Sequence, residues 1–120
     1  VDLAQPHVFT LFEYYLTDKA GHAQDTARAE DVVRSLDRFV GTLLETVDLT
    51  RTLLILTSDH GNLEDLGTRG HTRNPVPFVA LGAGASAMAS VRSLMDVVPA
   101  LLAIPTKAVG AAHAPAGASS

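Results

Sequence analysis

The chain has 120 residues, a length that suits one domain or part of one. Its 47% of hydrophobic residues excludes a disordered composition, and its net charge of −4 argues against a nucleic-acid-binding surface. Without cysteine, a metal ion would need carboxylate, imidazole, hydroxyl or carbonyl ligands. No apolar run approaches the roughly 20 residues that cross a bilayer, and no signal-peptide pattern is present, so we expect a cytoplasmic protein that binds no membrane.

Three elements are predicted in the first half of the chain. Residues 8–17 are rich in aromatic and β-branched types, which predicts a strand. Apolar residues at helical spacing over 25–47 predict a helix with its N-cap at Asp25 or Thr26. Residues 52–57 form an almost uninterrupted apolar run, which is typical of a strand buried on both faces of a parallel sheet.

The second half of the chain predicts a polar loop over 58–74, a strand over 78–81 and a helix over 91–103 that Pro99 ends or bends. Strand, helix and strand in this order predict a right-handed βαβ unit. The predicted fold class is therefore α/β, a parallel sheet flanked by helices. A sheet of only three strands is incomplete, so we expect exposed apolar surface and association with another chain.

Two pairs of metal-binding side chains follow the predicted strands. Asp18 and His22 stand four residues apart across a turn that contains glycine, and this spacing lets both converge on one cation. The plainer interpretation is a capping aspartate and a solvated histidine. Asp59 and His60 directly follow the strand at 52–57, where α/β sheets bind ligands, although a turn cap beside a surface histidine also fits them. Both pairs should emerge at the same edge of the sheet.

His71 completes a set of two carboxylates and three imidazoles on that predicted edge. Burying the carboxylates together without a cation would cost free energy, and two divalent ions would remove that cost and create a phosphoryl-transfer site. Arg69 and Arg73 flank His71, where they either contact a substrate phosphate or serve as surface charges. Glu64 and Asp65 either support the ligands or keep the loop solvated.

The motifs resemble those of a known family. TSDHGNLEDLGTRGHTRNPVPFVALG, residues 57–82, resembles the C-terminal signature of the alkaline phosphatase superfamily. Within it, Asp-His-Gly-Asn followed by His-Thr-x-Asn-Pro-Val-Pro is most similar to cofactor-independent phosphoglycerate mutase, and phosphopentomutase is more distant. LTDKAGH, residues 16–22, is similar to the Asp-x-x-Gly-His segment of the superfamily. The resemblance covers residues 9–104, and three motifs in this order are a specific combination.

The resemblance implies an alkaline-phosphatase-like fold with two divalent metal ions, Mn or Zn. Asp18, His22 and His71 match the ligands of one metal, and Asp59 and His60 match ligands of the second. It further implies that the metals activate a serine or threonine nucleophile and polarise a phosphoryl group. The implied partner is a phosphorylated small-molecule substrate, and the implied activity is that of a phosphohydrolase or phosphomutase.

The N-terminal half of that family supplies the nucleophile and one further metal ligand, and nothing in this chain matches either. The chain also begins with Val1 rather than Met. We therefore expect residues 1–106 to be the C-terminal portion of a metalloenzyme domain, with the N-terminal part of the fold missing, and 107–120 to be a flexible tail. Two alternatives stay open: a catalytically inactive metal-binding or regulatory module, and a structural domain without metal.

Overall fold

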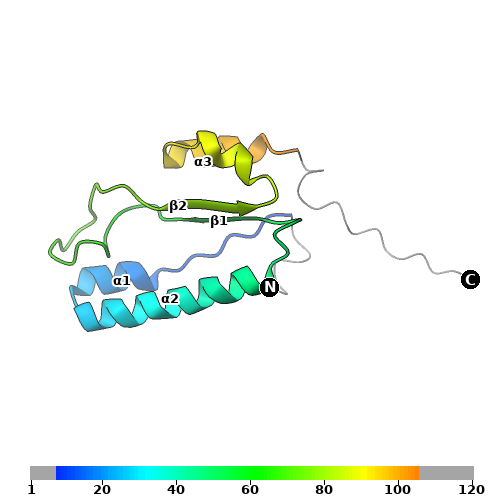
Figure 1. The fold of residues 1–120 in the computed structure, drawn as a ribbon. Coiled ribbons are helices and arrows are strands. Elements are labelled where there is room, and N and C mark those ends of the chain that lie inside the picture. The colour runs from blue at the N-terminus through cyan, green and yellow to red at the C-terminus, as the bar shows by residue number, and fades with distance from the viewer. Residues whose placement is uncertain (1–7, 106–120) are drawn as a thin grey trace, which may run out of the picture. The chain divides into compact units, whose positions relative to one another are not determined.

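The structure is a computed structural model and describes residues 8–105. The elements are α1 (Leu16–Ala23), α2 (Thr26–Thr46), β1 (Leu53–Thr57), β2 (Phe78–Gly82), the 3-10 helix η1 (Ala85–Ser90) and α3 (Leu94–Leu102) (Figure 1). They belong to two compact units: residues 8–47 together with 55–79, and residues 48–54 together with 80–105. In the described part, no helix combines the length and the apolar character needed to cross a membrane. The tail predicted over 107–120 lies outside the described residues.

The helix predicted over 25–47 is confirmed as α2. Asp25 is its N-cap, and its Oδ1 accepts a hydrogen bond of 3.1 Å from Arg28 N. Six apolar residues at helical spacing are half-buried: Val32, Leu36, Phe39, Val40, Leu43 and Val47. Helix α1 lies beside α2 (Figure 1), and the segment before α1 adds an aromatic contact in which the rings of Phe12 and Phe39 are 4.8 Å apart.

The strand predicted over residues 8–17 is wrong. The segment from 8 to 15 forms neither strand nor helix, and α1 begins at Leu16. Strand propensity reflects how well a residue fits a paired, half-buried surface, and no described strand pairs with this segment. Its apolar side chains are exposed instead, with Val8 at 85% and Leu11 at 73%. Asp18 therefore lies inside a helix, one turn before His22 and on the same face.

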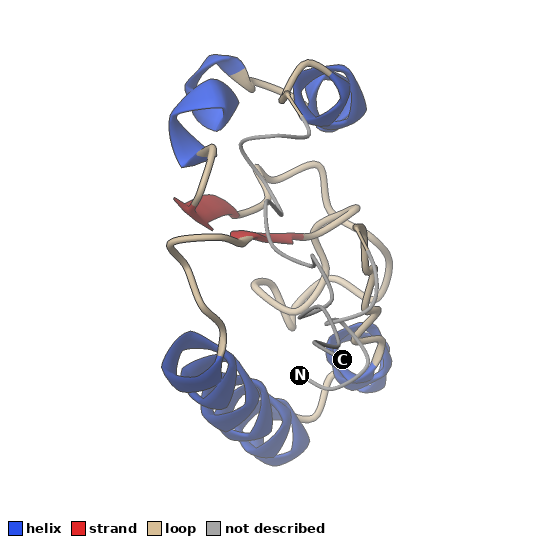
Figure 2. Cartoon of the chain, turned by 90° about the vertical axis from the view of Figure 1, so that its right-hand side faces the viewer, coloured by secondary structure: helices blue, strands red, loops and turns tan. Residues whose placement is uncertain are grey.

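The sheet also differs from the prediction. The strands expected at 52–57 and 78–81 are confirmed as β1 and β2, but they form a two-stranded antiparallel sheet rather than part of a parallel one. Figure 2 shows the two strands side by side. The chain between them holds no helix to carry it back for a parallel crossover, so it reverses direction. A two-stranded sheet leaves outer edges uncovered, and β1 is half-buried to exposed rather than buried on both faces.

Strand β2 ends at a residue that must be glycine. Gly82 has φ of +87°, and a Cβ at this position would lie 2.2 Å from the backbone oxygen of Thr52, so only glycine fits. The helix predicted over 91–103 is confirmed as α3. Ser93 and Asp96 form its capping box, and Pro99 lies inside the helix without ending it.

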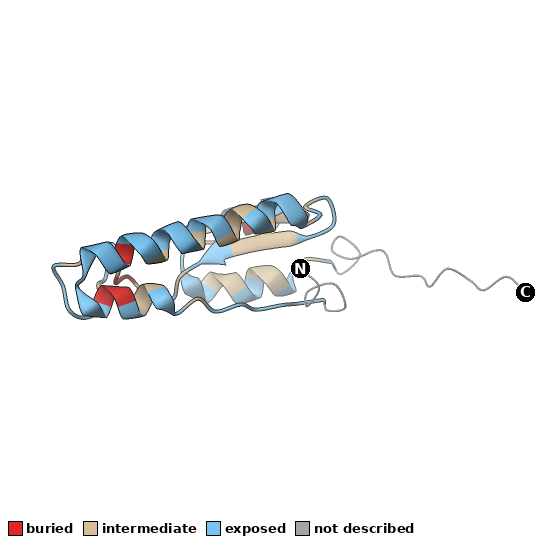
Figure 3. Ribbon diagram, turned by 90° about the horizontal axis from the view of Figure 1, so that it is seen from below, coloured by how far each residue is buried: buried red, intermediate tan, exposed pale blue. Residues whose placement is uncertain are grey.

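Few apolar residues are buried in residues 8–105, namely Ala20, Ala29 and Met88 (Figure 3). The first two belong to α1 and α2, where small side chains let neighbouring helices approach closely. Many large apolar side chains are exposed instead, among them Met95 at 83% and Leu102 at 82%. The expectation of exposed apolar surface is confirmed, and association with another chain stays a prediction.

Candidate metal centre

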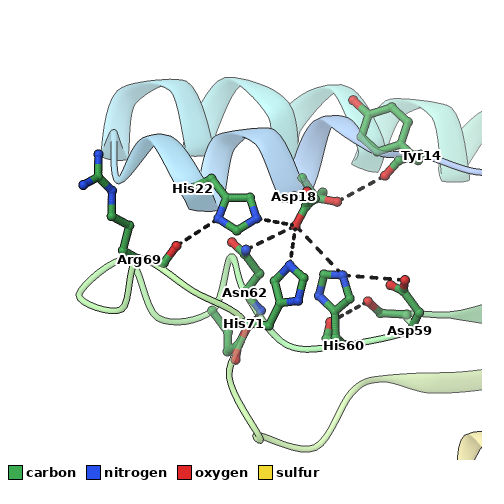
Figure 4. A network of polar contacts seen from close by, with 11 residues as sticks. Tyr14, Asp18, His22, Asp59, His60, Asn62, Arg69 and His71 are labelled. Carbon is green, nitrogen blue, oxygen red and sulfur yellow. Dashed lines mark hydrogen bonds and ion pairs between the residues drawn. The ribbon is translucent and has the colours of Figure 1, made fainter.

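Three imidazole rings converge on one carboxylate oxygen (Figure 4). The Nε2 atom of His22 lies 3.3 Å from Oδ1 of Asp18. The Nε2 atoms of His71 and His60 lie 3.4 Å and 4.0 Å from the same oxygen. These side chains are partly exposed, from 29% for His60 to 50% for His71. The cluster is therefore open to an ion from solvent.

The loop that follows β1 brings His60 and His71 together. Gly61 and Thr72 form an antiparallel bridge, in which Thr72 N donates a hydrogen bond of 2.8 Å to Gly61 O. The two histidines each precede a bridge residue, and their rings stack with centroids 3.6 Å apart and planes inclined by 14°. Helix α1 supplies Asp18 to the same place. The motifs therefore lie close together, as predicted. They are brought together by the antiparallel bridge between Gly61 and Thr72 and by helix α1, rather than by the ends of parallel strands.

A backbone carbonyl fixes the tautomer of the neutral His22 ring. His22 Nδ1 lies 2.9 Å from the backbone oxygen of Arg69. A carbonyl oxygen only accepts hydrogen bonds, so Nδ1 carries a proton and donates it. In the neutral ring, Nε2 then presents its lone pair toward Asp18. Metal-binding histidines commonly have this arrangement, with one nitrogen on the ion and the other donating to a carbonyl.

Glu64 joins the two sides of the segment between β1 and β2, residues 58–77, the candidate metal-binding loop. Its carboxylate accepts hydrogen bonds from the Thr72 hydroxyl, from Asn74 Nδ2 at 3.0 Å and from Asn62 N at 2.7 Å. These hydrogen bonds lower the pKa of Glu64 from 4.5 to about 2. The Thr72 hydroxyl has the largest effect, and the N–H of Glu64 itself, the Asn74 side chain and the N–H of Asn62 add to it. Asp65, by contrast, accepts hydrogen bonds only within its own turn, from Gly67 N and the Thr68 hydroxyl in the described part of the chain.

Asn62 contacts the cluster, although the sequence does not single it out. Its side chain is 4% exposed, and its Nδ2 donates a hydrogen bond of 3.2 Å to Oδ1 of Asp18. The available signal was its place in the Asp-His-Gly-Asn motif. Nothing in the spacing of residues indicates that an amide in one motif contacts a carboxylate in another.

The remaining predicted residues lie at the margin of the cluster. Asp59 is 85% exposed, and its Oδ2 lies 3.6 Å from His60 Nε2. Arg69 reaches His22 through its backbone oxygen, while its guanidinium points away from the imidazoles (Figure 4). Arg73 is exposed on the same loop. The described residues therefore bring four predicted ligands together, with Asp59 beside them, and the guanidinium of Arg69 is directed away from them.

The donor atoms fit a divalent transition metal. Asp18, His60 and His71 each offer one ligand atom, and these three atoms lie within 4.8 Å of one another. Two ligands about 2.0–2.1 Å from a tetrahedral zinc ion are about 3.4 Å apart, close to the 3.3 and 3.4 Å separations of His22 and His71 from Asp18. Imidazole and carboxylate together suit zinc and manganese. These residues could hold such an ion with small adjustments.

Comparison with known proteins identifies the family. A profile of the Metalloenzyme superfamily matches residues 3–104. The chain belongs to the Metalloenzyme superfamily. This membership implies the alkaline-phosphatase-like fold, within which the described residues contain helices and a small antiparallel sheet.

The relatives are cofactor-independent phosphoglycerate mutases, and the chain is homologous to their C-terminal region. It is 39% identical over 105 residues to the 2,3-bisphosphoglycerate-independent phosphoglycerate mutase of Halobacterium salinarum, covering 81% of this chain and 20% of that protein. The enzyme of the same name from Thermomicrobium roseum is 32% identical over 114 residues, covering 85% of this chain and 22% of that protein. The chain thus spans about a fifth of the length of these relatives. No solved structure matches the chain.

Proposed function

We propose that this chain supplies metal ligands to a two-metal-dependent phosphoryl-transfer enzyme, a phosphohydrolase or phosphomutase, in the longer protein of which it forms the C-terminal part. The observation that carries the proposal is the convergence of three imidazole nitrogens on Asp18 Oδ1. The relatives are named phosphoglycerate mutases, and this supports a phosphorylated small molecule as the substrate. In this proposal residues 1–106 are the C-terminal portion of a metalloenzyme domain.

The ligands divide between two ions, which we propose to be Mn or Zn. Asp18, His22 and His71 hold the first ion, and the distances of 3.3 and 3.4 Å from Asp18 Oδ1 to the Nε2 atoms of His22 and His71 support this grouping. Asp59 and His60 hold the second ion. The position of His60 supports a pair of neighbouring ions, because its Nε2 lies 4.0 Å from Asp18 and 3.6 Å from Asp59.

Divalent ions at such a site polarise a phosphoryl group and activate a hydroxyl nucleophile. The contribution of this chain is to hold donors of the correct charge state in place. His22 keeps its Nε2 lone pair free for coordination because its Nδ1 donates to Arg69 O. We assign contact with the substrate phosphate to the guanidinium groups of Arg69 and Arg73, which flank His71 in the sequence and can form paired hydrogen bonds with phosphate oxygens. In this assignment the Arg69 guanidinium, which points away from the imidazoles in the structure, turns toward the bound phosphate.

Metal content measured by plasma mass spectrometry tests the proposal. We expect about one or two equivalents of Mn or Zn in the purified chain, and less in His71→Ala, because that variant loses one imidazole ligand. His113→Ala is the matched control, since it removes a histidine that lies outside the three motifs. Circular dichroism of both variants separates the loss of a ligand from the loss of the fold.

Metal-free protein with a melting temperature indifferent to added Mn²⁺ and Zn²⁺ would contradict the proposal. Equal metal content in His71→Ala and His113→Ala would contradict the assignment of His71. The alternative, a catalytically inactive metal-binding module, predicts metal binding without phosphoryl transfer. The chain spans about a fifth of its relatives, so this alternative is tested by assaying the longer protein for release or migration of phosphate.

A further inference from the structure

Asn62 is a buried polar side chain with one satisfied end and one unsatisfied end. Its Nδ2 donates to Oδ1 of Asp18 at 3.2 Å. Its Oδ1 is buried and accepts no hydrogen bond from any described residue. The reverse orientation of the amide would place two acceptor oxygens together, so the donor end must face the carboxylate. Leaving the Asn62 Oδ1 without a hydrogen bond costs free energy. The hydrogen bond from Nδ2 to Asp18 is therefore what favours this orientation of the amide.

Gly21 makes room for this amide. A Cβ added to Gly21 would lie 1.3 Å from Oδ1 and 2.5 Å from Cγ of Asn62, which leaves no space for any side chain. The glycine of Asp-x-x-Gly-His and the asparagine of Asp-His-Gly-Asn therefore occupy one shared volume. Helix α1 can approach the metal-binding loop this closely only where one of its residues lacks a Cβ.

We propose that Asn62 is a positioning residue, whose amide, seated against Gly21, orients the Asp18 carboxylate toward the metal ligands His22 and His71. The proposal rests on the metal site of the proposed function and assigns a role to a residue outside its ligand set. Carboxylate ligands are commonly held by hydrogen bonds from partners that do not touch the metal, and removing such a partner weakens metal binding by about 10–100-fold.

Three variants of the full chain separate positioning from packing. Asn62→Ala removes the donor and leaves a cavity. Gly21→Ala adds a methyl group that collides with the Asn62 amide, so we expect a lower melting temperature. In the double variant the new methyl group fills the vacated space, so its melting temperature should exceed that of either single variant. Because no donor then reaches Asp18, Mn²⁺ binding should stay weak in the double variant.

The readout is the Mn²⁺ dissociation constant, from electron paramagnetic resonance of free Mn²⁺, beside the melting temperature of the metal-free protein. We expect Asn62→Ala and the double variant to bind Mn²⁺ about 10–100-fold more weakly than the wild type. Gln24→Ala is the matched control, because Gln24 Nε2 donates to Leu66 O at 3.0 Å and so joins the end of α1 to the same loop without contacting Asp18. It should bind Mn²⁺ as the wild type does.

Recovery of wild-type affinity in the double variant would show that Asn62 acts only by packing and would overturn the proposal. An unchanged dissociation constant in folded Asn62→Ala would overturn it as well. Either result leaves the proposed function standing, since the wild type binds Mn²⁺ in both. A wild-type chain that binds neither Mn²⁺ nor Zn²⁺ overturns the proposed function and this inference together. If Asn62→Ala does not fold, the repacked double variant still gives the decisive comparison.

Discussion

Asp18 and Asp59 each stand beside a histidine, but their surroundings differ. Asp18 is 38% exposed, lies within 4.0 Å of three imidazole nitrogens and accepts a hydrogen bond from Asn62. Asp59 is 85% exposed and lies 3.6 Å from one imidazole nitrogen. A carboxylate that several ordered side chains surround already has the position needed to bind an ion. An exposed carboxylate loses conformational freedom when it binds one, and this costs free energy. The two halves of the candidate centre should therefore differ in metal affinity.

Replacing Asp18 should have the largest effect. In Asp18→Asn the oxygen on which the imidazoles converge loses its charge, so Mn²⁺ affinity should fall by more than the roughly 10–100-fold typical of a partner outside the ligand set. The melting temperature of the metal-free chain should change little, because partly exposed ion pairs contribute only about 0–1 kcal/mol. Isothermal titration with Mn²⁺ and a thermal melt measure the two effects.

Asp37→Asn, on the exposed side of α2, is the matched control for the loss of one negative charge. It should leave Mn²⁺ affinity unchanged. An equal loss of affinity in both variants would mean that the net charge of the chain, rather than the position of Asp18, attracts the ion.

Glu64 should give a smaller effect, visible in the pH dependence of stability. Its pKa is lowered from 4.5 to about 2 in the folded chain, chiefly by the Thr72 hydroxyl. Its stabilising contribution is therefore complete above the unfolded pKa of about 4.5 and is lost as the pH falls toward 2. The melting temperature of Glu64→Gln should therefore fall less steeply than that of the wild type between pH 5 and pH 2. This is the range between the unfolded and folded pKa values of Glu64, over which the wild type loses the contribution of this carboxylate.

A residual pH dependence should remain in Glu64→Gln. The pKa of Asp96 is also lowered, chiefly by a hydrogen bond from the N–H of Arg92 and further by the hydroxyl and N–H of Ser93. This carboxylate is present in both proteins. Thermal melts of the two metal-free proteins across that range supply the comparison. Parallel curves would mean that Glu64 does not hold the two sides of the metal-binding loop in solution.

The elements that depend on local pattern were predicted well, and those that depend on a partner were not. Helix α2 has an apolar stripe and a capping aspartate within its own sequence, and both predict it correctly. Residues 8–15 have strand propensity, but a strand also requires a neighbour, and no described strand pairs with them. The direction of the sheet failed for the same reason, because the parallel prediction depended on that first strand.

The candidate site was predicted as a set of residues but not as a geometry. Asp18, His22, His60 and His71 belong to short motifs whose residue types suit a metal, so the sequence is sufficient to nominate them. Their actual meeting depends on the bridge between Gly61 and Thr72 and on the helical position of Asp18. Asn62 was missed because its contact with Gly21 joins two segments that are distant in the sequence.

Asp59→Asn should have the smallest effect, and it decides how the two halves are divided. Because Asp59 is exposed and contacts only His60 among the described side chains, its loss should leave the tighter Mn²⁺ site within about twofold of the wild type. Any weaker second equivalent should disappear, since it would then depend on His60 alone. Isothermal titration resolves the two steps. Loss of the tight step would instead place Asp59 and Asp18 on one ion, with His60 as their shared ligand.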